Sequence, residues 1–263
     1  MVEHIIKIEK MKYIYFCICC IILSCCDQRT EVIKIKKYYE DGTIRLVYEK
    51  RHNKLHGEYK QYYPSGNIKI TASYKNGLQD SLQYYYYDFG VVKQKSFFKN
   101  GLLCGEVFTY DEKGNLSTSQ TYIIKNDSSY INQVINYTDN GSVDKERSNF
   151  FTIDTYKDTI KYGEAFAVDV KLEASYYNKN MLVVFGDFDN NFNHWTYTDS
   201  ISDRMDEAVD FKVHYSTTRY RKGSNVLRGI IHDYISYYEN DSSQNILRDV
   251  RPLYFEVNYF VKD

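Results

Sequence analysis

The chain has 263 residues, with 34 Lys and Arg against 35 Asp and Glu, so its formal net charge is −1. A charge this close to zero lacks the basic surface of a nucleic-acid-binding protein, and no nucleic-acid partner is predicted. The 29 Tyr and 14 Phe, with only 2 Pro, favour β-strands, and no segment shows the apolar period of a helix. The composition therefore predicts an all-β protein.

The first 24 residues have the parts of a secretory signal peptide: a basic start, an apolar run over 13–23 and a small residue before the break. The apolar run is too short to span a bilayer, which needs about 20 residues. The sequence Ile22-Leu23-Ser24-Cys25 resembles a bacterial lipobox. This resemblance implies that Cys25 is acylated and becomes the new N-terminus. Both Met1 and Met11 fit as the start of the signal, and an uncleaved anchor or a plain secreted protein are the alternatives.

A lipid-anchored protein of the bacterial cell envelope, in the outer membrane, is the resulting expectation, with residues 25–34 as a tether. Five of the six cysteines lie at or before position 26, so only Cys104 remains in the folded body and no disulfide framework is predicted. Cys104 would need a His partner in space to act as a nucleophile, and we predict no such role.

Glycine and tyrosine recur every 24 residues over the segment 35–125. A fixed period of this length indicates stacked repeats, each predicted here as a β-hairpin unit with glycine at its turns. Ser81 interrupts the second of the glycine series, and His52-Asn53 stands where later units have Asn-Gly. The glycines predicted at turns are Gly42, Gly66, Gly90 and Gly114 in the first series, Gly57 and Gly105 in the second, and Gly77 and Gly101 after Asn.

Polar and apolar residues alternate in the strands of these units, as over residues 67–74. The alternation predicts Ile68, Ile70 and Ala72 on one face of the sheet, with Lys69 and Thr71 on the other. Because one hairpin is marginal in water, neighbouring units are expected to stack and bury the aromatic residues.

The units resemble the MORN-variant repeat. The residues that carry the resemblance are Tyr62-Tyr63-Pro64-Ser65-Gly66, Tyr74-Lys75-Asn76-Gly77, Phe98-Lys99-Asn100-Gly101 and Gly57-Glu58-Tyr59. It implies a stacked array of β-hairpins. The same repeat occurs in proteins labelled as antitoxin components and in many surface lipoproteins of unknown role.

The 24-residue period ends before the C-terminal part of the chain. Residues 126–157 are predicted as a degenerate repeat and connector around Asp139-Asn140-Gly141, and residues 158–263 as a β-sandwich built from short alternating strands. Met181–Phe185 is predicted as a buried strand. The stretch from Gly223 to Ile230, with the final aromatic strand, loosely resembles the immunoglobulin-like modules of bacterial envelope proteins.

Two groups of residues in the C-terminal part resemble parts of a metal-binding or catalytic motif, but neither group completes one. Asp187, Asp189 and Asn191 begin like a calcium loop, but Phe192 stands at the required glycine, so a strand-connecting turn is predicted and no metal or cofactor. Asp233, beside His232, is predicted to lie on a solvated strand edge.

These observations predict a non-catalytic envelope lipoprotein that binds or scaffolds a protein or a glycan, held at the membrane by its acyl anchor. One alternative is an antitoxin or immunity protein that neutralises a toxin. Another is an enzyme acting on the cell wall or on glycans, which would need acidic residues converging in a cleft.

Overall fold

The structure, a computed structural model, describes residues 31–178, 180–192, 196–201, 211–238 and 246–263. Within these residues the chain forms strands and no helix, which confirms the predicted all-β fold. Accordingly, the described part of the chain contains no helix long and apolar enough to cross a membrane. The predicted signal peptide and Cys25 lie outside the described residues.

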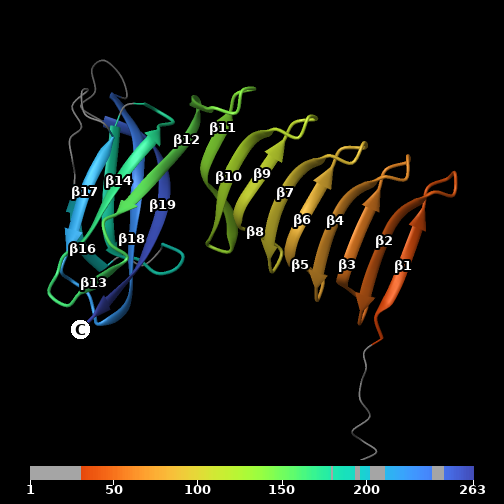
Figure 1. Cartoon of the computed structure of the whole chain (residues 1–263), viewed down its shortest axis with the longest axis horizontal. Coiled ribbons are helices and arrows are strands. Elements are labelled where there is room, and N and C mark those ends of the chain that lie inside the picture. Colours follow the sequence, from red (N-terminus) through yellow and green to blue (C-terminus); the bar gives the residue numbers. More distant parts are fainter. Residues whose placement is uncertain (1–30, 179, 193–195, 202–210, 239–245) are drawn as a thin grey trace, which may run out of the picture.

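The first half of the chain is a row of antiparallel hairpins, which Figure 1 shows side by side along the long axis. Each of the longer strands pairs with the next longer one, and the two-residue strands β5 and β8 pair with β4 and β7 at the lower hairpin ends. The strands are β1 (Ile33–Tyr38), β2 (Ile44–Arg51), β3 (Lys54–Tyr62), β4 (Ile68–Lys75), β5 (Leu78–Gln79), β6 (Ser81–Tyr86), β7 (Val92–Lys99), β8 (Leu102–Leu103), β9 (Gly105–Tyr110), β10 (Leu116–Lys125), β11 (Ser128–Tyr137) and β12 (Val143–Thr155).

One end of every hairpin is closed by a turn with glycine in the left-handed region. In the first turn Tyr39 N donates to Thr43 O at 2.8 Å and Gly42 N donates to Tyr39 O at 3.1 Å, with Gly42 at φ 85°. A side chain rarely adopts this φ, which explains the 24-residue glycine series. The same pair of bonds closes the turns at Gly66, Gly90, Gly114 and Gly141.

The opposite ends are closed by two-residue turns with positive φ at both central residues. This is the type I′ geometry, whose twist matches that of the flanking strands. Asn76-Gly77 and Asn100-Gly101 have it, and so does His52-Asn53, with φ values of 49° and 60°. The replacement of Asn-Gly in the first unit therefore leaves the turn type unchanged.

Ser81 holds a backbone conformation that suits glycine. Its φ is 111°, whereas Gly57 and Gly105 stand at the corresponding sites with φ 90° and 73°. We expect Ser81→Gly to raise the free energy of unfolding by about 1 kcal/mol, because it removes the strain of a side chain at positive φ. Urea denaturation measures the change.

Gly105→Ala is the matched control for Ser81→Gly. A Cβ at position 105 would meet nothing within 4 Å, so only backbone strain opposes it, and it should lower stability by a similar amount. Equal stability of Ser81→Gly and the parent protein would contradict the strain at Ser81.

One predicted strand face is wrong. Tyr62 pairs with Ile68, whereas the preceding Gln61 pairs with Ile70, so Lys69 is an extra residue in β4. Consecutive strand residues face opposite sides, and directly paired residues share a side. Ile68 therefore lies on the face opposite Ile70, because this bulge interrupts the alternation that the sequence suggested.

The second half of the chain is a sandwich of two sheets. The sheet of β12, β14 (Phe166–Ala174) and β17 (Lys212–Thr217) faces a sheet of β13 (Thr159–Lys161), β15 (Asn180–Asp187), β16 (Thr196–Ile201), β18 (Gly223–Tyr238) and β19 (Ile246–Lys262). Side chains from both sheets form one core, in which Phe185 stacks on Tyr215 with ring centroids 3.9 Å apart. The predicted buried strand over Met181–Phe185 is confirmed, since four of its residues are buried.

Strand β12 belongs to both halves. Its first residues pair with β11, and its residues from Phe150 to Thr155 pair with β14. Between these parts the register jumps, because Asn136 pairs with Asp144 while Val134 pairs with Asn149. Such a bulge bends a strand, and here it turns β12 from the array into the sandwich (Figure 1).

The two halves differ in how much apolar surface they bury. The core cluster consists of sandwich residues, and most of them are at most 4% exposed. Among the described residues of the array, the buried apolar side chains are Val47, Tyr48, Ala72 and Val107. The array is therefore a single-layer sheet whose two faces both meet solvent.

Candidate binding surface

A row of aromatic–aliphatic pairs runs along one face of the array. In each hairpin the last residue of one strand is a tyrosine that pairs directly with the first residue of the next strand, beside the glycine turn. We call these ten residues the tyrosine row. Its pairs are Tyr38 with Ile44, Tyr62 with Ile68, Tyr86 with Val92, Tyr110 with Leu116 and Tyr137 with Val143.

None of the ten residues of the tyrosine row is buried. Tyr38 is 53% exposed, Ile68 37% and Val143 40%. Adjacent strands are about 4.8 Å apart, so successive pairs recur about every 10 Å along the sheet. Nearer the lower hairpin ends of β6 and β7, the strands that carry Tyr86 and Val92, Leu82 and Phe97 form another exposed pair. The array therefore leaves a row of apolar side chains at least partly open to solvent.

A second set of tyrosines ties the hairpins together. The hydroxyl of Tyr39 donates to Tyr62 O at 2.7 Å, and that of Tyr63 donates to Tyr86 O at 2.7 Å. Tyr87 continues the series to Tyr110 O at 3.0 Å. Each bond joins one glycine turn to the next hairpin, so these three side chains are structural.

The series of bonds from tyrosine hydroxyls ends at the fourth glycine turn, where Asp111 stands in the place of the tyrosine. Asp111 accepts hydrogen bonds from Lys113 N at 2.9 Å and from Asn115 N at 2.8 Å, within its own turn. The side chain of Asn115 also donates from Nδ2 to Asp111 Oδ2 at 3.0 Å, and this bond, more than the two backbone bonds, lowers the pKa of Asp111. The fourth glycine turn is thus closed locally.

Basic side chains cover the rings on the other face of the array. Lys69 Nζ lies 5.3 Å from the ring centroid of Tyr63 and 6.0 Å from that of Tyr85. Lys93, 24 residues later, lies 5.6 Å from Tyr85 and 5.1 Å from Tyr87. Both lysines sit at the bulges, which direct them over these rings, and cation–π contact is favourable within about 6 Å. The tyrosine row therefore lies on the face opposite these lysine–tyrosine contacts.

The outer face of the sandwich carries a polar cluster around Asp169. Its carboxylate is 2.7 Å from Lys212 Nζ and 2.7 Å from His214 Nδ1, and it accepts a hydrogen bond from the Tyr156 hydroxyl at 3.1 Å. These contacts, led by Lys212, lower the pKa of Asp169 to about 2. An Asp–His pair can orient a general base. Here His214 contacts Asp169 Oδ1, whereas Lys212 and Tyr156 share Oδ2, so the cluster links β14 and β17 to the residue that follows β12.

Asp169 should make the free energy of unfolding depend on pH in the acidic range. Its folded pKa of about 2 lies below the unfolded value of about 3.9, so its contribution is present above pH 4 and is lost as the pH falls through 2. We expect Asp169→Asn to lower the free energy of unfolding at pH 7, with a difference from the parent that shrinks between pH 4 and pH 2. Urea melts across this range measure it.

The control for Asp169→Asn is Asp139→Asn in an exposed turn, which should leave the pH profile unchanged. A constant difference between Asp169→Asn and the parent protein from pH 7 to pH 2 would contradict the role of the ionised carboxylate.

The predicted candidate residues occupy several separate places. Asp187 ends β15, and Asp189 and Asn191 follow it in a turn, where Asn191 N donates to Asp189 Oδ1 at 2.8 Å. Among the described residues, no three His, Cys, Asp or Glu side chains form a group that could hold a metal. Burial raises the pKa of the Cys104 thiol, which disfavours its reactive thiolate.

The prediction for Asp233 is wrong. Its side chain is fully buried and accepts hydrogen bonds from Asn149 Nδ2 at 2.9 Å, Ser175 Oγ at 2.6 Å and Tyr176 N at 2.5 Å. The reason is topological, because β18 lies between β15 and β19 and is no edge strand. Asp233 fixes the turn after β14.

The tyrosine row was partly visible in the sequence, since Tyr62, Tyr86 and Tyr110 keep the 24-residue period. Their aliphatic partners were not, because the bulge that pairs them with the tyrosines leaves no sequence signal. The polar residues around Asp169 follow the strand alternation, but their proximity depends on the strand order β12–β14–β17.

Comparison with known proteins supports the repeat. The family model of the MORN repeat variant matches residues 55–76 and 79–100, which span β3 to β7. This confirms the MORN-variant resemblance for that part of the array. None of the curated proteins matches the chain.

Proposed function

We propose that this chain is a non-catalytic binding module of the bacterial cell envelope, and that the tyrosine row is its binding face. The observation that carries the proposal is the run of paired aromatic and aliphatic side chains left unburied along one face of a single-layer sheet. If the array served only as a spacer, these apolar side chains could be polar, because a spacer needs no exposed apolar surface.

The spacing of the row favours an extended partner. Pairs that recur about every 10 Å contact a ligand at several points along its length, as a strand-like protein segment or a glycan chain would allow. Tyrosine rings suit both partners, because they offer apolar area for packing and a hydroxyl for hydrogen bonding.

Further features of the proposal rest on the sequence. The lipobox resemblance supports a lipoprotein anchored through Cys25 in the outer membrane, and the loose resemblance to immunoglobulin-like modules supports an interaction role for the sandwich. Two or more acyl chains give stable membrane anchoring. The occurrence of the repeat in antitoxin-labelled proteins supports toxin neutralisation as a second role, for which an adjacent toxin gene is the decisive observation.

Photo-cross-linking in intact cells tests the binding face. A cross-linking amino acid at position 97, beside the tyrosine row, should trap a partner, and Tyr38→Ser with Ile68→Ser should abolish the product, because both exposed side chains leave the row. Tyr176→Ser is the matched control, since Tyr176 is 70% exposed on the sandwich. Equal cross-linking in the row variant and the control would refute the binding face.

Metabolic labelling with palmitate tests the anchor separately. Cys25→Ala should remove the label and release the protein from membranes, while Cys26→Ala should keep both. Undiminished labelling of Cys25→Ala would overturn the lipoprotein assignment without touching the binding face.

A further inference from the structure

Strand β1 ends the array, and among the described residues it pairs with β2 alone. Figure 1 shows it as the last strand of the row. Backbone N–H and C=O groups of a strand point alternately to its two sides, so β1 presents a row of them on the side away from β2. We call this side the array edge. Backbone groups exposed in this way are a template for one more strand.

The side chains of β1 are more exposed than those of its neighbour β2. Five of the six residues of β1 are exposed, whereas only one of the eight residues of β2 is, because β2 has a strand on each side. Ile33 is 56% exposed, and Val32, directly before the strand, is 42% exposed. A strand added at the array edge would cover part of this apolar surface, which favours the addition.

The two faces of β1 differ in character. Ile35 pairs directly with Tyr48 and therefore lies on the same face of the sheet, and so does Ile33, two residues earlier. Lys34 and Lys36 lie on the opposite face, because consecutive strand residues alternate. The array edge therefore has an isoleucine side and a lysine side.

The lysine side of the array edge is incompletely neutralised. Lys36 is exposed, pairs across the strands with the uncharged Val47, and makes no ion pair with another described residue. Lys34 Nζ has one long contact, 3.8 Å from Glu58 Oε2, and Glu58 also contacts Lys60. No acidic residue lies in β1 itself. Acidic side chains of a partner would supply the missing negative charge at this edge.

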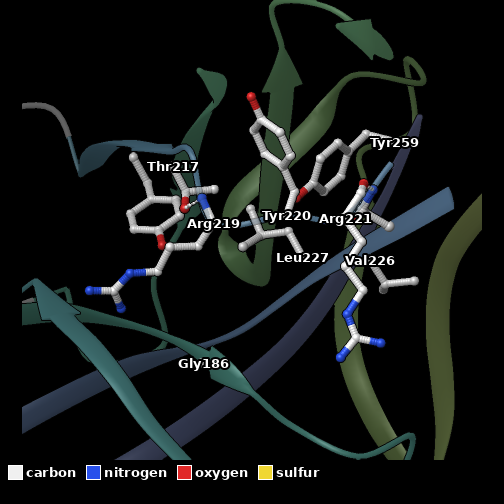
Figure 2. A pocket seen from close by; sticks show the side chains of 10 residues that line it. Gly186, Thr217, Arg219, Tyr220, Arg221, Val226, Leu227 and Tyr259 are labelled. Carbon is white, nitrogen blue, oxygen red and sulfur yellow. Dashed lines mark hydrogen bonds between the residues drawn. The ribbon is translucent and has the colours of Figure 1, made fainter. Parts of the chain in front are cut away.

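The hollow between the end of β17 and the start of β18 offers a partner less than the array edge does (Figure 2). In Figure 2 the side chains of Arg219 and Arg221 at this hollow extend away from each other. Asn225 accepts a hydrogen bond from Arg221 N at 3.0 Å and donates one to Arg221 O at 2.7 Å, and Arg219 N donates to Thr217 Oγ1 at 3.0 Å. The polar groups of this loop are thus engaged within it, whereas the outer backbone groups of β1 have no described strand beside them.

We propose that the array edge binds an acidic strand of a partner protein. The backbone of that strand continues the ladder of the array beyond β1. Its apolar residues lie beside Ile33 and Ile35, and its acidic residues lie opposite Lys34 and Lys36. Lys37, on the isoleucine side, takes a further acidic residue. This proposal concerns the edge of the sheet, whereas the tyrosine row lies on its face, so each can fail without the other.

A second copy of this chain fits the array edge less well than an acidic strand does. If two β1 strands paired antiparallel with Ile35 opposite Ile33, Lys34 would stand opposite Lys34. With Ile35 opposite Ile35, Lys34 would stand opposite Lys36. Like charges directly opposite each other are destabilising, so the lysines disfavour self-pairing while they favour an acidic partner.

Fluorescence anisotropy with the full chain tests the proposal, with a labelled peptide in which valine and glutamate alternate. Its counterpart has lysine in place of glutamate. The glutamate peptide should bind about tenfold more tightly than the lysine peptide. Lys36→Glu should reduce this ratio about tenfold, because it repels the one peptide and attracts the other, whereas Lys99→Glu, at an exposed position of β7, should leave the ratio unchanged. Failure of the glutamate peptide to bind, or an unchanged ratio in Lys36→Glu, would overturn the proposal.

A methylated peptide separates strand pairing from simple charge attraction. The glutamate peptide with every backbone nitrogen methylated keeps its charges but has no N–H group to donate, so it should not bind. If it bound as tightly as the unmethylated peptide, charge alone would account for the binding, and the added strand would be refuted.

Vesicles of phosphatidylglycerol test an anionic membrane as the alternative ligand of the lysines. The full chain and Lys36→Glu should bind these vesicles equally, since the proposal assigns Lys36 to a protein strand. Vesicle binding that is lost in Lys36→Glu, by a chain that does not bind the glutamate peptide, would assign the array edge to the membrane surface instead.

Discussion

Replacing Gly229 with alanine will destabilise the protein by about 3 kcal/mol, the upper part of the range for overpacking a core. A Cβ at this position would stand 2.3 Å from Phe255 Cζ and 2.9 Å from the backbone oxygen of Val184. The ring of Phe255 packs in turn against Phe185 and Phe151, with centroids 5.7 and 6.0 Å away. Because neither the ring nor the backbone has free space, the sheet must deform.

Chemical denaturation measures the loss in Gly229→Ala, and Ser224→Ala, at an exposed position of the same strand, is the control. The double variant Gly229→Ala with Phe255→Leu identifies the cause. If the clash with the ring dominates, the double variant is less destabilised than the sum of the two single variants. A Gly229→Ala protein as stable as the parent would show that the core adapts without cost.

The sequence allowed the array to be predicted because its turns depend on local chemistry. Glycine at positive φ and Asn-Gly pairs act within a few residues, so a 24-residue period in them reports the hairpins directly. The bulge at Lys69 depends instead on pairing between strands. No local pattern revealed the bulge, and the face predicted for Ile68 in β4 was therefore wrong.

The sites were less predictable because their residues meet only in the folded chain. Asp233 looked like a surface residue beside His232, yet the central place of β18 buries it. The cluster around Asp169 joins Tyr156 to Lys212 and His214, which lie far from it in the sequence. In both cases the strand order, which alternation alone does not specify, decides what a side chain contacts.

A buried amide lies at the junction between the array and the sandwich. Asn132 on β11, only 3% exposed, donates from Nδ2 to Tyr254 O at 2.7 Å and accepts from Tyr254 N at 2.7 Å. It therefore satisfies both backbone groups of one β19 residue, as a neighbouring strand would. Around it, Tyr130 donates to Pro252 O at 2.7 Å, and Arg251 donates to the Tyr130 hydroxyl at 2.7 Å.

Asn132→Leu should uncouple the two halves of the protein. Leucine has a similar size but no polar atoms, so the N–H and C=O of Tyr254 lose their partners, at about 1–3 kcal/mol for each buried group. We expect the array to melt before the sandwich in calorimetry, and amide exchange at Tyr254 to accelerate. Asn258→Leu, at an exposed position of β19, should change neither. Parent-like melting and exchange in Asn132→Leu would place the coupling in the shared strand β12, which would then suffice to make the array and the sandwich unfold together.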